Sequence, residues 1–165
     1  MNFLAGTINA LVLAGMAAVG SYQIKDAQAK QEVNSISKKE FHCLQQNVYF
    51  EARNQSELGQ RAVAWVTLNR MTHKRYPNTI CEVVFQRKQF SWTHDGKKDE
   101  PGKNILEQRA WQKAGEIADS VLDKWYNNAK SPVENAIMFH AHYVKPSWRK
   151  QYDRVAQIDD HIFYQ

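Results

Sequence analysis

The chain has 165 residues, and 22 lysines and arginines against 17 aspartates and glutamates give a formal net charge of +5. This length fits one domain, and 43% hydrophobic with 24% charged residues excludes a disordered, collagen-like or multi-span membrane chain. Five Trp, seven Tyr and seven Phe suit a groove that stacks against sugars or bases. The basic residues are scattered rather than gathered in one stripe, so we expect no nucleic-acid partner.

The N-terminal segment differs from the rest of the chain. Phe3 to Val19 carries no charge and is apolar apart from Thr7 and Asn9, so it is just long enough to span a bilayer but only weakly hydrophobic. Two modes of export stay open: a signal peptide cleaved at the small-residue pattern Ala27-Gln28-Ala29, or an uncleaved marginal membrane anchor. A buried Ala-rich helix is the alternative to export. The expected organisation is a leader over 1–29, a linker over 30–38 and one folded domain over 39–165.

The two cysteines agree with export. Cys43 and Cys81 are 38 positions apart, and neither lies in a spacing typical of zinc or redox motifs. A disulfide between them fits an oxidising compartment, while two buried free thiols are the alternative.

Four segments begin with the same helix-capping pattern, in which Ser, Thr or Asn is followed three residues later by Glu. The expected caps are Ser37, Asn54, Thr79 and Asn104. Apolar residues then recur at helical spacing, which predicts helices over about 38–52, 55–70, 80–85 and 105–125. Between the last two, Trp92 to Lys103 is polar and predicts a surface loop.

The C-terminal part predicts strands. Ile137 to Val144 and Arg154 to Tyr164 are rich in aromatic and apolar residues, which favours a small antiparallel pair with His140 and His142 on one face. The expected fold class is therefore mainly α, with a short C-terminal β element.

Glu51 is the most unusual carboxylate. It follows Val48-Tyr49-Phe50 and precedes Ala52, and apolar neighbours can desolvate a carboxyl and raise its pKa towards that of a general acid. The alternative is an ordinary ion pair with Arg53 or Arg70 at a helix end.

Three histidines form a second candidate site. His140, His142 and His161 could hold a metal ion if the two strands pair, although no known metal-ligand spacing is present. Packing within an aromatic strand pair is the alternative.

Several motifs follow one another along the chain: Asn47–Asn54, Gly59–Val66, Leu68–Arg70, Tyr76–Gln86, Gln89–Ser91, His140–Trp148 and His161–Tyr164. In this order they resemble the SleB-like cell-wall hydrolases, from about Phe41 to Gln165. The resemblance implies a small lysozyme-like or lytic-transglycosylase-like helical domain in which Glu51 is the catalytic acid. Asn54 departs from the Gly that the family often has, and Asn tolerates the same left-handed backbone. The cysteine pair also occurs in many family members.

The activity that this resemblance implies is cleavage of the β-1,4 bond between N-acetylmuramic acid and N-acetylglucosamine in peptidoglycan. The matched motifs hold no obvious second carboxylate, because Asp159 and Asp160 fit a turn. A lone acid suits a lytic transglycosylase, which leaves 1,6-anhydromuramic ends and needs no cofactor or metal. The residues expected to bind the glycan are Gln89, Phe90, Ser91, Trp92, His140, Tyr143 and Tyr164.

Two other functions stay open at this stage. One is a metal-dependent N-acetylmuramoyl-L-alanine amidase that uses His140, His142 and His161. The other is a catalytically silent wall- or nucleic-acid-binding module. We expect a monomer whose partners are peptidoglycan glycan strands and, through the leader, the inner membrane. It would be exported to the periplasm or cell envelope, as a phage endolysin of the signal-anchor-release kind or a bacterial periplasmic hydrolase.

Overall fold

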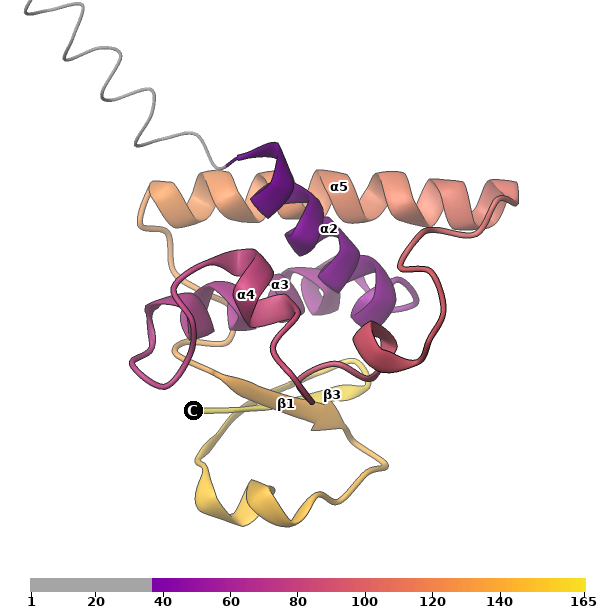
Figure 1. The fold of residues 1–165 in the computed structure, drawn as a ribbon. Helices are drawn as coiled ribbons and strands as arrows, with labels where there is room; N and C mark the ends of the chain where they lie inside the picture. Colours follow the sequence, from indigo (N-terminus) through magenta and orange to yellow (C-terminus); the bar gives the residue numbers. More distant parts are fainter. Residues whose placement is uncertain (1–36) are drawn as a thin grey trace, which may run out of the picture. The chain divides into compact units, whose positions relative to one another are not determined.

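The fold was analysed in a computed structural model that describes residues Ser37–Gln165. The predicted leader and nearly all of the linker lie outside the described residues. Figure 1 shows the α-helices on one side of this unit and the sheet on the other, with the short helical turn Ser147–Gln151 beyond the sheet. Within the described residues, no helix combines the length and the apolar character that a membrane span needs. The elements are α2 (Lys38–Ala52), α3 (Glu57–Thr72), α4 (Ile80–Val84), η1 (Ser91–His94), α5 (Ile105–Tyr126), β1 (Met138–Ala141), η2 (Ser147–Gln151), β2 (Arg154–Ile158) and β3 (His161–Tyr164).

The four predicted helices are confirmed, and local chemistry explains where they begin. The expected cap at Asn54 is wrong, because α3 begins at Glu57 and its cap is Ser56. Ser37, Ser56, Thr79 and Asn104 each accept a hydrogen bond from the backbone N–H three residues further on. Such a cap satisfies one of the N–H groups that have no partner inside the helix, and it contributes about 1 kcal/mol. The predicted surface loop is shorter than expected, because its first residues belong to the 3₁₀ helix η1.

The helical core centres on α2, which packs against α3, α4 and α5. Leu44 and Val48 of α2 are fully buried, and a buried hydrogen bond of 2.8 Å runs from Thr67 Oγ1 in α3 to Asn47 Oδ1 in α2. The predicted disulfide is confirmed: Cys43 in α2 and Cys81 in α4 are joined, with their Cα atoms 5.2 Å apart. The bond therefore fixes α4, and the loop that follows it, to α2.

The sheet has three antiparallel strands in the order β1-β3-β2, not the predicted pair. The run from Arg154 to Tyr164 is a hairpin, because Asp159 adopts a left-handed backbone with φ of 47° and turns the chain. The turn expected at Asp159 and Asp160 is confirmed, but it separates two strands rather than a strand and a tail. β1 ends at Ala141, so His142 lies beyond the strand and strand alternation does not place it beside His140.

Two contacts hold the sheet to α3. At the C-terminal end of α3, Asn69 Nδ2 donates to the carbonyls of Glu134 and Ala136, just before β1. At the N-terminal end, the Asp159 carboxylate accepts from the N–H and the hydroxyl of Ser56. Gly59 permits this approach, since a Cβ there would lie 2.4 Å from Asp159 Oδ2.

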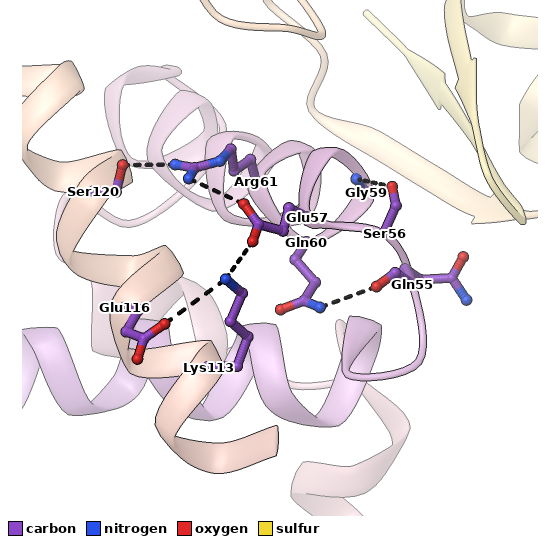
Figure 2. Close-up of polar contacts among 9 residues, drawn as sticks. All are labelled: Gln55, Ser56, Glu57, Gly59, Gln60, Arg61, Lys113, Glu116 and Ser120. Atoms are coloured by element: carbon purple, nitrogen blue, oxygen red, sulfur yellow. Dashed lines mark hydrogen bonds and ion pairs between the residues drawn. The ribbon is translucent and has the colours of Figure 1, made fainter. Parts of the chain in front are cut away.

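The first turn of α3 is also tied to α5 (Figure 2). Lys113 of α5 contacts Glu57, and Arg61 Nη1 donates to Ser120 Oγ at 2.6 Å. Glu57 is exposed and Lys113 and Arg61 are partly exposed, so each ion pair adds little stability. Together they direct Glu57 towards α5.

Candidate active site

A groove of about 800 Å³ lies where the end of α2, the end of α3 and the 88–94 loop face β1 and the segment after it. It contains the predicted acid and four of the seven residues that we expected to bind glycan. The residues that line it are Glu51, Arg70, Lys88, Gln89, Phe90, Ser91, His94, Met138, Phe139, His140, Val144, Pro146 and Trp148.

Glu51 is half-buried in the last turn of α2, between Phe50 and the fully buried Ala52. It makes no ion pair within the part of the chain that the structure describes. Arg53, one of its predicted partners, lies 3.4 Å from Glu107 instead, with its guanidinium over the Tyr49 ring. The alternative of an ordinary ion pair with Arg53 or Arg70 is therefore not found among the described residues, and Glu51 faces the groove without a salt bridge.

Burial raises the pKa of Glu51 from an ordinary value of 4.5 to about 7. The indole N–H of Trp92 and the charge of Arg70 act in the opposite direction and limit the rise. A carboxyl with this pKa is largely protonated just below neutral pH and can still release its proton. A group that first donates and then accepts a proton must be able to exist in both the protonated and the deprotonated form.

This raised pKa makes a prediction about stability. Between pH 4.5 and 7 the folded chain holds the Glu51 proton and the unfolded chain does not, so stability falls as pH rises through this range. We expect Glu51→Gln to be more stable than the wild type by about 2 kcal/mol at pH 8, and by much less at pH 4.5. Urea unfolding at both pH values measures this difference. An equal difference at the two values would contradict the raised pKa.

Trp92 forms a wall beside Glu51 rather than an exposed stacking face. Its side chain is buried, and its ring stacks on Phe50 with 4.6 Å between centroids. Its Nε1 is buried and makes no hydrogen bond to any of the described residues. The N–H is therefore available to the Glu51 carboxylate once that group has lost its proton.

Arg70 is a groove residue that the sequence analysis did not assign to substrate binding. Its Nε donates to the carbonyl of Ile137 at 2.7 Å, and its guanidinium lies 5.3 Å from the ring centroid of Tyr76 and 5.4 Å from that of Phe90. Its Nη1 is buried without a partner among the described residues. In the sequence, the signal for Arg70 was a charged residue within a helical segment whose other side chains are mostly core residues.

The remaining predicted glycan-binding residues divide into two groups. Gln89, Phe90, Ser91 and His140 line the groove. Tyr143 is 75% exposed and lies outside the groove lining, and Tyr164 is buried, with its hydroxyl 2.9 Å from His140 Nε2. Tyr164 therefore orients His140 rather than facing the groove itself.

The three histidines do not come together as a metal site. His140 Nδ1 lies 2.8 Å from the Ala141 carbonyl, so both of its ring nitrogens already have partners. His161 is buried against Phe139 and Phe163, and this burial lowers its pKa. Across residues 37–165, no group of three His, Cys, Asp or Glu side chains is placed to hold a metal ion. His161 is therefore packed within the sheet, His140 is held at the groove by Tyr164, and His142 is exposed beside Asp160.

Glu51 is the only carboxylate among the described residues that line the groove. Asp159 is bound to Ser56, and Asp160 accepts from Gln55 Nε2 at 3.1 Å. Glu57 contacts Lys113 (Figure 2). The other acids that could have served as a second catalytic carboxylate are therefore engaged outside the groove.

Comparison with known proteins identifies the family to which this chain belongs. Residues 54–164 match the family model described as cell wall hydrolase. The chain belongs to this family.

The curated relatives are spore cortex-lytic enzymes. The one from Bacillus subtilis (strain 168) is 29% identical over 141 residues, which are 84% of this chain and 42% of that protein. The one from Bacillus cereus is 31% identical over 103 residues, which are 56% of this chain and 40% of that protein. The chain thus spans about two fifths of the length of these relatives.

Two solved structures share the fold. The catalytic domain of the SleB protein of Bacillus cereus superposes with a TM-score of 0.63 at 27% identity, covering 80% of this chain and 94% of that domain. The catalytic domain of the germination-specific lytic transglycosylase SleB from Bacillus anthracis gives a TM-score of 0.59 at 28% identity, covering 80% and 98%. The predicted fold class and family resemblance are confirmed.

Proposed function

We propose that this chain is a peptidoglycan lytic transglycosylase that cleaves the β-1,4 bond between N-acetylmuramic acid and N-acetylglucosamine. The observation that carries the proposal is the single carboxyl in the groove, Glu51, with a pKa of about 7. Glycosidases that use water or a covalent intermediate need two carboxyl groups flanking the bond. A transglycosylase needs one, because the attacking group belongs to the substrate.

The proposed reaction is a proton transfer followed by its reverse. Glu51 gives its proton to the glycosidic oxygen, and the bond from this oxygen to C1 of the muramic residue breaks with its electron pair on the leaving sugar. The C6 hydroxyl oxygen of the same muramic residue then bonds to C1, and its proton passes to the Glu51 carboxylate. No water is consumed. In this account, the Trp92 N–H and the buried charge of Arg70 stabilise the carboxylate between the two steps.

The relatives and the fold support this proposal from a different direction. One solved relative is described as a lytic transglycosylase, and the curated relatives are described as lytic enzymes of the spore cortex. Their names report what those proteins do. The likeness extends to nearly the whole of both solved catalytic domains.

The proposed substrate lies outside the cytoplasm, so we propose that the chain acts in the cell envelope. The Cys43–Cys81 disulfide fits this location, because disulfides persist in oxidising compartments. The net charge of +5 favours approach to an anionic envelope.

The pH dependence of the reaction follows from the pKa of Glu51. The free enzyme must hold the Glu51 proton to start the reaction, so kcat/KM on purified peptidoglycan should fall about tenfold per pH unit well above pH 7. A series of initial rates from pH 5 to pH 9 measures this limb. A rate that stays level to pH 9 would show that Glu51 is not the essential acid.

A chelation experiment tests this proposal against the amidase hypothesis, which no contact among the described residues favours. Purified peptidoglycan is digested with and without EDTA, and zinc is then added back. We expect the same rate of solubilisation in all three samples. Loss of activity with EDTA and its return with zinc would reject the Glu51 mechanism.

A further inference from the structure

A second cavity, of about 530 Å³, adjoins the site of Glu51 and has no part in the reaction proposed above. Phe50 and Trp92, whose rings stack together, line it. Phe50 directly precedes Glu51, and the Trp92 N–H acts on the Glu51 carboxyl. The second cavity therefore lies close to Glu51, although its lining shares no residue with that of the groove.

The walls of the second cavity are strongly charged. Seven of its twelve lining residues are acids or bases that are charged at neutral pH, namely four carboxylates and three cations. They come from the 95–100 segment, from Arg53 at the end of α2 and from Glu107 in the first turn of α5. Such a mixture of both signs is suited to a ligand that itself carries charges of both signs.

The charged wall is fixed in place by hydrogen bonds from the helices. Gln46 Nε2 in α2 donates to the Asp99 carbonyl at 2.8 Å, and the Gly102 N–H donates to the Tyr49 hydroxyl at 3.3 Å. Gln108 Nε2 in α5 donates to the Gly102 carbonyl at 2.6 Å. The loop is therefore held at two points, so its charges need little reordering when a ligand binds.

Three of the charges in this wall, Lys98, Asp99 and Glu100, make no ion pair within the described residues. Arg53 is paired with Glu107, and Lys97 with Asp95. Lys98 and Glu100 are exposed and make no ion pair with any residue in the described range 37–165. The cavity thus offers one cation, Lys98, and two carboxylates, Asp99 and Glu100, that no ion pair within residues 37–165 neutralises, and Lys98 and Glu100 are the more exposed of the three.

We propose that this cavity binds the peptide stem carried by the muramic residue at the cleaved bond, and this rests on the proposed function. The N-acetyl sugars of the glycan are uncharged, so they can form hydrogen bonds but no ion pairs with Lys98 and Glu100. The lactyl group of muramic acid instead carries a short peptide with carboxylates and, where a diamino acid is present, a free amine. Lys98 contacts a stem carboxylate, and Glu100 contacts the stem amine. The enzyme therefore favours peptide-bearing glycan.

The test compares two substrates prepared from the same peptidoglycan: glycan strands that carry stems with a diamino acid, and strands from which an amidase has removed the stems. We expect the wild type to have a kcat/KM about tenfold higher on the stem-bearing strands. Lys98→Gln and Glu100→Gln should each lower kcat/KM on these strands by about three- to fivefold, as for exposed charge pairs, and leave cleavage of stripped strands unchanged. Lys103→Gln is the matched control, because Lys103 is an exposed residue of the same loop that does not line the cavity.

Ionic strength gives an independent readout. Exposed charges are screened by salt, so the preference for stem-bearing strands should shrink between 0.05 and 0.5 M NaCl in the wild type and stay small throughout in Lys98→Gln. Equal cleavage of both substrates by the wild type would overturn the proposal. So would an equal loss on both substrates in Lys98→Gln, which would identify the cavity as a sugar subsite.

The outcome for the stem cavity and the outcome for the proposed function can be separated by the products. If both substrates give 1,6-anhydro ends without preference, only the stem proposal fails. If cleavage depends on the stem but gives reducing ends, the proposed reaction fails and the stem cavity stands.

Discussion

Glu51→Gln is expected to fold and to lose nearly all lytic activity. Gln keeps the size and the polarity of the side chain but has no acidic proton, so the leaving oxygen departs without protonation. General acid catalysis contributes about 10²- to 10⁴-fold to a rate, and we expect a loss in that range. Turbidity of a peptidoglycan suspension, followed at pH 6 where wild-type Glu51 is protonated, measures the loss.

The control for this variant is Glu57→Gln. Glu57 is an exposed carboxylate six residues further along the chain, and it contacts Lys113 on the side of α3 that faces α5 (Figure 2). Its substitution should change activity less than threefold, since it does not line the groove. Glu51→Gln activity within a few-fold of the wild type would remove Glu51 from the mechanism. A large loss in Glu57→Gln would instead identify Glu57 as a second catalytic carboxylate.

The second large effect concerns the Cys43–Cys81 disulfide. The bond joins residues 38 positions apart. Closing a loop of this length is expected to stabilise the folded chain by about 3 to 4 kcal/mol, through the lower entropy of the unfolded chain. Replacing both cysteines with Ala should therefore lower Tm by roughly 10 °C or more. Thermal unfolding of the double variant, and of the wild type with and without a reductant, measures this.

Reductant distinguishes the stability that the covalent bond contributes from the stability that the two cysteine side chains contribute by packing. The wild type in reductant should approach the double variant, and the double variant should not respond to reductant at all. A double variant within 1 kcal/mol of the oxidised wild type would show that the packing of α2 against α4 holds these helices together without the covalent link. Because α4 leads into the 85–94 loop, activity near Tm should decline together with the fold.

The helices could be predicted from sequence because their signals are local. Each cap needs only Ser, Thr or Asn and the backbone N–H three residues later, so Ser37 and Asn104 mark helix starts without any knowledge of the rest of the fold. The number of strands could not be predicted in the same way. The turn at Asp159 depends on a left-handed backbone and on Ser56, which is more than a hundred residues away in sequence.

The site also combines features that local sequence predicts with features that depend on long-range contacts. The apolar neighbours of Glu51 in sequence suggested a raised pKa, and burial of the carboxyl agrees with that reasoning. Its choice as the catalytic acid came from the family resemblance. The place of Arg70 depends on Ile137 and Phe90, which approach it only in the folded chain. Trp92 resembled an exposed sugar platform in sequence, but its stacking on Phe50 buries it. Residue types indicated the chemistry, whereas long-range packing decided which side chains reach the groove.

The central claim is that one carboxyl group cleaves the glycan without water. Mass analysis of the muropeptides released from purified peptidoglycan tests this directly, because it reports the bond and the product together. We expect fragments that end in 1,6-anhydromuramic acid, each lighter by one water than the same fragment with a reducing muramic acid end. Reducing-end muramic acid as the main product would contradict it, since water would then be the attacking group and a second base would have to reach the groove.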